Sequence, residues 1–189
     1  IVTHITADGS EKISLDVSVE PDNTSGGASN SIGENGYKRT WNTTVSGGRI
    51  SVNRQLTDNQ MKFSSQTQVI TDNGGTVTDG DGKVSVSGAS EVTIITSMGT
   101  DYKDEYPSYR TGETADELTN RVKWYVDQAK VKTYEELKAN HVNDYQNIFN
   151  RVDLDLGQTI STKTTDALLS AYKAGTASEA ERTWAGIKK

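Results

Sequence analysis

The side chains that could do chemistry here are the carboxylates and two histidines. The 189 residues include no cysteine. The lack of cysteine excludes disulfides, thiolate nucleophiles and cysteine-ligated metals. His4 and His141 are too few for a multi-histidine metal site. His141 falls on the apolar stripe of an expected helix, and we expect it to be buried in a core. The sequence therefore predicts no metal and no cofactor.

The carboxylates are numerous, but their spacing marks out no acid–base pair. Hydrolysis of a glycosidic bond needs two carboxyl groups held about 5–10 Å apart across that bond. The clusters along the chain are Asp101, Asp104 and Glu105, then Glu135 and Glu136, then Asp153 and Asp155. Each cluster is typical of a solvated surface, so we predict no catalytic residue.

The segment Asp79-Gly80-Asp81-Gly82 allows two interpretations. Alternating aspartates begin a calcium-binding loop, but Lys83 stands where such a loop needs another oxygen ligand. Asp-Gly pairs also form tight hairpin turns. We therefore predict a hairpin turn.

Four aromatic residues are candidates for contact with carbohydrate, since flat rings with a polar edge stack on sugars. They are Trp41, Tyr102, Tyr106 and Tyr109. The alternative is that these rings fill the seam between a β layer and a helical layer.

The bulk composition narrows the class of partner. The net charge of −6 argues against nucleic acid, whose phosphates require clustered Lys and Arg. No apolar run approaches the roughly 20 residues of a membrane span. Only 32% of the residues are hydrophobic, and the chain opens on the apolar run Ile1–Thr6. We therefore expect a sheet cut from a larger body, with self-association of the exposed edges.

The chain changes character near residues 102–112, because 13 of the 17 glycines precede residue 100. Before that point, apolar–polar alternation and Gly-rich turns predict antiparallel strands. The expected strands are Ile13–Val19, Lys38–Val45, Arg49–Asn53, Met61–Thr71, Lys83–Ser87 and Glu91–Ser97. The polar segment Asn23–Gly36 is expected to be a mobile loop.

After residue 113 the pattern is helical. Thr114 and Glu117, and then Thr133 and Glu136, have the spacing of capping boxes, and an apolar residue recurs every three or four positions behind each. We expect these two helices to pack on each other. A third helix is predicted from Thr165 and a fourth from Ser178. The expected fold is α+β, with a β-sandwich portion over residues 1–112 and a helical linker of three to four helices over 113–189.

Residues 141–157 read His-x-x-Asp-Tyr-x-x-x-Phe-x-Arg-Val-x-Leu-x-Leu-Gly. With the β region before it and the helix start at Thr165 after it, this string resembles the region between sandwich and barrel in the α-L-fucosidases of glycoside hydrolase family 95. The resemblance covers nearly the whole chain, and the segment Asn23–Gly36 departs from it as an insertion.

The resemblance implies half of a larger super-sandwich, with a catalytic α/α barrel and the remaining sandwich half in polypeptide outside this chain. It implies inverting hydrolysis of terminal α-linked L-fucose by the parent enzyme. A barrel glutamate would be the general acid, and the fucosylated glycan the substrate. The parent is expected to be secreted or on the surface of a bacterium. Two alternatives stay open, a carbohydrate-binding or adhesion module and a parent that acts on α-L-galactosides.

Overall fold

The computed structural model describes residues 1–19, 31–32, 37–56, 59–72, 74–153, 162–178 and 181, with only the backbone given for 31–32 and 37–41. The chain divides into two compact units, Ile1–Asn140 and His141–Lys189. Among the described residues, none of the helices has both the length and the apolar character of a membrane span.

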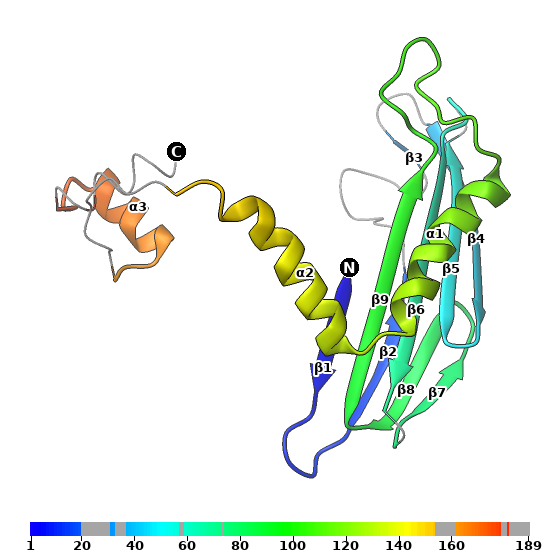
Figure 1. The fold of residues 1–189 in the computed structure, drawn as a ribbon, viewed down its shortest axis with the longest axis horizontal. Helices are drawn as coiled ribbons and strands as arrows, with labels where there is room; N and C mark the ends of the chain where they lie inside the picture. Colours follow the sequence, from blue (N-terminus) through cyan, green and yellow to red (C-terminus); the bar gives the residue numbers. More distant parts are fainter. Residues whose placement is uncertain are drawn as a thin grey trace. The chain divides into compact units, whose positions relative to one another are not determined.

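The first unit is built on two antiparallel sheets (Figure 1). The six-stranded sheet has the order β1-β9-β6-β5-β4-β3, and the three-stranded sheet has the order β2-β8-β7. The strands are β1 (Val2–Thr6), β2 (Ile13–Ser18), β3 (Ser31–Ile32), β4 (Tyr37–Ser46), β5 (Arg49–Leu56), β6 (Lys62–Thr71), β7 (Thr76–Asp79), β8 (Lys83–Ala89) and β9 (Glu91–Thr100). Together with the helices after them, the sheets confirm the predicted α+β sandwich.

Alternation along the strands creates the core between the two sheets. Ile50 and Val52 of β5 are fully buried in one cluster with Val84 and Val86 of β8. The intervening residues of β5 are polar and lie on the opposite, outer face, because successive side chains of a strand point to opposite sides. The sheet therefore has an apolar inner face and a polar outer face.

Two of the predicted Gly-rich turns are confirmed. Gly47 and Gly48, with φ of 62° and 69°, join β4 to β5 in the conformation that a two-residue hairpin requires. Their backbone N–H groups donate to the Asp79 carboxylate at 2.6 and 2.8 Å. Residues Asp79–Lys83 make the turn between β7 and β8, where Gly80 N donates to the Lys83 carbonyl at 2.9 Å.

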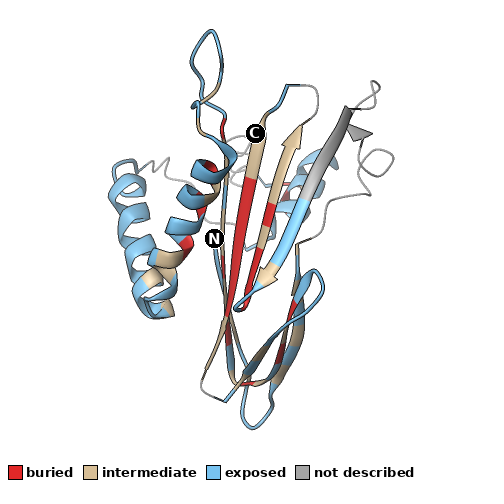
Figure 2. Cartoon of the chain, turned by 90° about the vertical axis from the view of Figure 1, so that its right-hand side faces the viewer, coloured by how far each residue is buried: buried red, intermediate tan, exposed pale blue. Residues whose placement is uncertain are grey.

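Helix α1 (Ala115–Lys130) begins at the predicted capping box of Thr114 and Glu117. Its buried residues are Leu118, Val122 and Val126. Figure 2 colours the buried parts of the chain red. The helix packs on the outer face of β6 and β9, so the expectation that α1 packs on the next helix is wrong. The periodic stripe identified the buried face of the helix correctly but not the element that covers it.

Helix α2 (Tyr134–Phe149) begins at the second predicted capping box, where the Glu136 carboxylate accepts from Thr133 N at 2.8 Å. The ring of Tyr134, the first residue of α2, stacks on His4 of β1 with 4.1 Å between the ring centroids. This contact holds the start of the helix against the sheet. No residue of α2 is buried. The prediction of a buried core position for His141 is therefore wrong.

In the second unit, α3 (Thr165–Lys173) confirms the third predicted helix and buries Leu168. Ser178 and Glu181 exchange the hydrogen bonds of a further capping box, as expected for a fourth helix start, while residues 182–189 lie outside the described part. Most of the expected loop over residues 23–36 also lies outside it, except that Ser31–Ile32 form β3.

Candidate functional site

Three of the four aromatic candidates lie on one loop. We call residues 101–113, between β9 and α1, the tyrosine loop, and in Figure 1 it projects beyond the end of β9. Tyr102, Tyr106 and Tyr109 are 51%, 81% and 42% exposed. The rings of Tyr106 and Tyr109 meet edge to face with 6.4 Å between centroids. These three rings therefore offer stacking surface to solvent instead of filling a seam.

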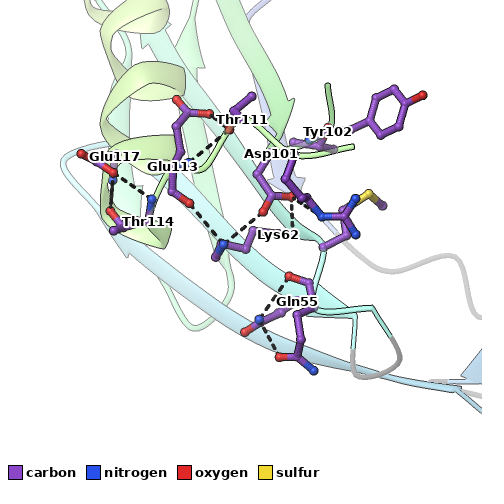
Figure 3. A network of polar contacts seen from close by, with 12 residues as sticks. Gln55, Lys62, Asp101, Tyr102, Thr111, Glu113, Thr114 and Glu117 are labelled. Carbon is purple, nitrogen blue, oxygen red and sulfur yellow. Dashed lines mark hydrogen bonds and ion pairs between the residues drawn. The ribbon is translucent and has the colours of Figure 1, made fainter. Parts of the chain in front are cut away.

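The tyrosine loop is anchored by the buried carboxylate of Asp101, which is 2% exposed (Figure 3). It accepts from Lys62 N at 2.9 Å and from Lys62 Nζ at 3.0 Å. The guanidinium of Arg110 lies 3.7 Å away. Tyr102, the next residue, points away from this network in Figure 3. Asp101 thus closes the base of the loop, and its charge is balanced by two cations.

The end of the loop is held by a second carboxylate. Glu113 accepts from Arg121 Nε at 2.7 Å and from Thr111 Oγ1 at 2.8 Å. These hydrogen bonds, Arg121 first, hold the pKa of Glu113 below its usual value. Asp101 and Glu113 therefore both hold the loop in place.

Trp41 lies on a different strand at the same end of the sheet. Its backbone pairs with Arg54, Arg54 pairs with Phe63, and Phe63 pairs with Thr100, which precedes the loop. Three strand spacings of about 4.8 Å put Trp41 about 14 Å from Thr100 along this row. The side chain of Trp41 lies outside the described part of the structure.

A polar groove of about 650 Å³ lies on the outer face of the six-stranded sheet, beside α1. Its lining residues come from the outer face of β4, β5 and β6, from the turn at Gly47 and from one side of α1. They are Thr44, Ser46, Gly47, Arg49, Ser51, Asn53, Gln66, Gln68, Thr119, Asn120, Lys123, Asp127 and Lys130. We call this set the polar groove.

An ion pair crosses the polar groove. Arg49 Nη2 donates to Asp127 Oδ1 at 2.6 Å, and Arg49 Nε donates to Gln68 Oε1 at 3.0 Å. Lys130 Nζ lies 3.4 Å from the same Asp127 oxygen. Hydrogen bonding to Arg49 is the main cause that lowers the pKa of Asp127. This carboxylate therefore stays ionised at neutral pH.

Two family models match the chain, one over each part of the fold. The model for the glycosyl hydrolase family 65 N-terminal domain matches residues 1–105, more than half of the chain. This chain belongs to that family. A second model, the glycosyl hydrolase family 95 catalytic domain, matches residues 133–183. A search of curated proteins finds no match.

These matches identify the β-sandwich as the N-terminal region of a glycoside hydrolase and support the resemblance to family 95 in part. In this glycoside hydrolase region, two of the acidic residues singled out from the sequence have structural partners among the described residues. Glu136 caps α2, Glu105 pairs with Lys103, and Asp155 lies outside the described residues. Within the described part of the chain, no three His, Asp or Glu side chains cluster as metal ligands would.

Sequence reasoning missed the polar groove of this glycoside hydrolase region. The signal was present, because Arg49, Ser51 and Asn53 alternate with buried apolar residues in β5, and Ser64, Gln66 and Gln68 alternate in β6. Such a pattern is typical of a strand with one solvated face. Only the position of α1 shows that this face forms one wall of a groove.

Proposed function

We propose that this chain is the non-catalytic sandwich and linker region of an α-L-fucosidase, and that it braces the catalytic α/α barrel of the parent enzyme. The observation that carries the proposal is the order of the two matches, with the family 65 N-terminal domain before the family 95 catalytic domain on one chain. The glycoside hydrolase class rests on those matches, while the choice of α-linked L-fucose rests on the family 95 resemblance of residues 141–157.

The surface of the second unit supports a bracing role. Tyr145, Ile148, Phe149 and Val152 are 52%, 67%, 61% and 79% exposed, and the rings of Tyr145 and Phe149 stack at 5.1 Å. Monomeric proteins rarely leave such an apolar stripe in water, because covering it is favourable. The proposed cover is the catalytic barrel.

The test is reconstitution of the chain with a separately produced catalytic barrel, with activity measured on 2'-fucosyllactose and on an aryl α-L-fucoside. We expect the chain to stabilise the barrel, and the substitution Phe149→Asp to weaken that association at least tenfold. Asn143→Asp is the matched control, since it adds the same charge to α2 away from the stripe. Equal association of both variants would contradict the bracing role.

A second candidate function is carbohydrate binding by the tyrosine loop, favoured by the exposure of its three rings. Titration of the chain with fucosylated glycans separates the two functions. A binding module would show saturable affinity that falls on Tyr106→Ala or Trp41→Ala, whereas a brace would show none.

Two further features of the parent can be tested. The alternative to fucose is L-galactose, and a kinetic comparison of α-L-fucoside and α-L-galactoside substrates with the complete enzyme distinguishes the two sugars. We also propose that the parent is secreted or on the surface of a bacterium, which fractionation of the source cells tests. Light scattering of the isolated chain tests the expected self-association.

A further inference from the structure

The base of the polar groove contains a buried amide with one unpaired polar atom. Gln66 is 1% exposed, and its Oε1 accepts from Ser51 Oγ at 2.8 Å. Its Nε2 has no hydrogen-bond partner among the described residues. Exchanging the oxygen and nitrogen of the amide would leave the oxygen unpaired instead. A buried polar group in this state is destabilising until a hydrogen-bond partner reaches it.

The lining of the groove selects the chemistry of that partner. It consists of hydroxyls, amides and charged groups, with no aromatic or large aliphatic side chain among its described members. An apolar ligand would gain little from such a surface, because every contact would desolvate a polar group. A sugar hydroxyl both donates and accepts, so it can pair with the Gln66 amide in either orientation.

The charges in the groove add a preference for an acidic ligand. Arg49, Lys123 and Lys130 face the single carboxylate of Asp127, in a chain whose net charge is −6. Arg49 and Lys130 already share Asp127, and no ion pair joins Lys123 to a carboxylate in the described residues. The exposed ammonium of Lys123 is therefore available to an anion at the rim.

We propose that the polar groove binds a saccharide with an acidic substituent, a carboxylate or a sulfate. The acidic group pairs with Lys123, and a ring hydroxyl reaches Gln66 after a small movement of the rim side chains. The volume of about 650 Å³ lies in the range typical of small-molecule sites. The proposal concerns binding only and stands whether or not the parent enzyme cleaves fucose.

The experiment is calorimetric titration of the 189-residue chain with tri-galacturonate, with neutral α-1,4-galactotriose, and with inorganic sulfate alone. We expect tri-galacturonate to bind at least fivefold more tightly than the neutral trisaccharide, and that preference to shrink at 0.5 M salt. Lys123→Ala should weaken tri-galacturonate binding about tenfold. Lys132→Ala, at an exposed position just beyond α1 and outside the groove lining, should leave it unchanged.

Gln66→Met keeps the approximate volume of the side chain and removes both the unpaired nitrogen and the oxygen that accepts from the partly buried Ser51 Oγ. We expect this variant to unfold at the same temperature or higher and to bind both trisaccharides more weakly, which separates lost binding from a lost fold. Three results would overturn the proposal. They are the absence of trisaccharide binding, binding that Lys123→Ala and Gln66→Met leave unchanged, and binding of sulfate as tight as that of tri-galacturonate.

Discussion

Asp101 offers the most direct test of how the tyrosine loop is held. Its carboxylate is 2% exposed and accepts from both the backbone N–H and the ammonium of Lys62, while its own backbone joins β6 and the end of the loop. Replacing it with alanine leaves the N–H of Lys62 without its acceptor and leaves Arg110 without its anion. The loop then loses the side-chain part of its attachment to the sheet, while the backbone hydrogen bonds of residue 101 remain.

The expected cost can be worked from these contacts. A hydrogen bond to a charged group contributes about 1.5–3 kcal/mol, and a buried N–H left unpaired costs about 1–3 kcal/mol. The side chain of Lys62 is 28% exposed, so its ammonium regains water and the first contribution is taken at its lower end. Asp101→Ala should therefore lower the free energy of unfolding by about 3 kcal/mol. Asp101→Asn keeps one acceptor and should lower it by about 1.5 kcal/mol.

Chemical denaturation followed by fluorescence measures these differences. For a chain of this size, 3 kcal/mol corresponds to a fall of about 6–12 °C in the melting temperature. Asp104→Asn is the control, since it removes an exposed carboxylate from the same loop and should change stability by less than about 0.5 kcal/mol. If Asp101→Ala and Asp104→Asn shift the unfolding transition equally, the reasoning about the anchor is wrong.

Three further predictions concern the helix and the carboxylates. Gly99→Ala should lower the free energy of unfolding by about 1–3 kcal/mol in chemical denaturation, because the added Cβ would lie 2.9 Å from Val122 Cγ2 under α1. Gly80→Ala is the control and should be tolerated, since its added Cβ has no neighbour closer than 3.4 Å. Thr114→Ala should cost about 1 kcal/mol by removing the cap of α1, and Thr114→Ser should restore most of it, as melting curves will show. The pKa values of Glu113 and Asp127 are lowered in the folded state, so the unfolded state binds more protons. The stabilisation from these two carboxylates should therefore be complete above about pH 5 and fall as the pH drops below about 4. The free energy of unfolding should fall less steeply with pH in Asp127→Asn. An unchanged pH profile in that variant would show that this carboxylate is not involved.

The strands were predictable where alternation and glycine turns coincide. Ile50 and Val52 alternate with polar residues directly after the Gly47-Gly48 turn, so β5 was predicted with the correct start. β7 was missed because Thr76–Asp79 is short and carries one apolar residue, Val77, whose burial depends on the strand beside it. Local pattern defines a strand only when several of its own residues are buried.

The helices show the same limit at longer range. The predicted stripe of α1 held Leu118, Val122, Tyr125, Val126 and Ala129. Leu118, Val122 and Val126 are buried, whereas Tyr125 is 52% exposed. The sequence could not show that Gly99 makes room for the helix on β9. His141 lies on a comparable stripe and is exposed, since periodicity describes the helix and not the surface that covers it. The polar groove depends on the same packing of α1 and was missed for that reason.

We propose that this glycoside hydrolase region positions a catalytic domain and does not itself cleave glycosidic bonds. The most direct test is turnover of an aryl α-L-fucoside by the purified 189-residue chain, with the same chain denatured by heat as background. We expect no release of the aryl group above that background. Release that rises in proportion to the concentration of folded chain would contradict it.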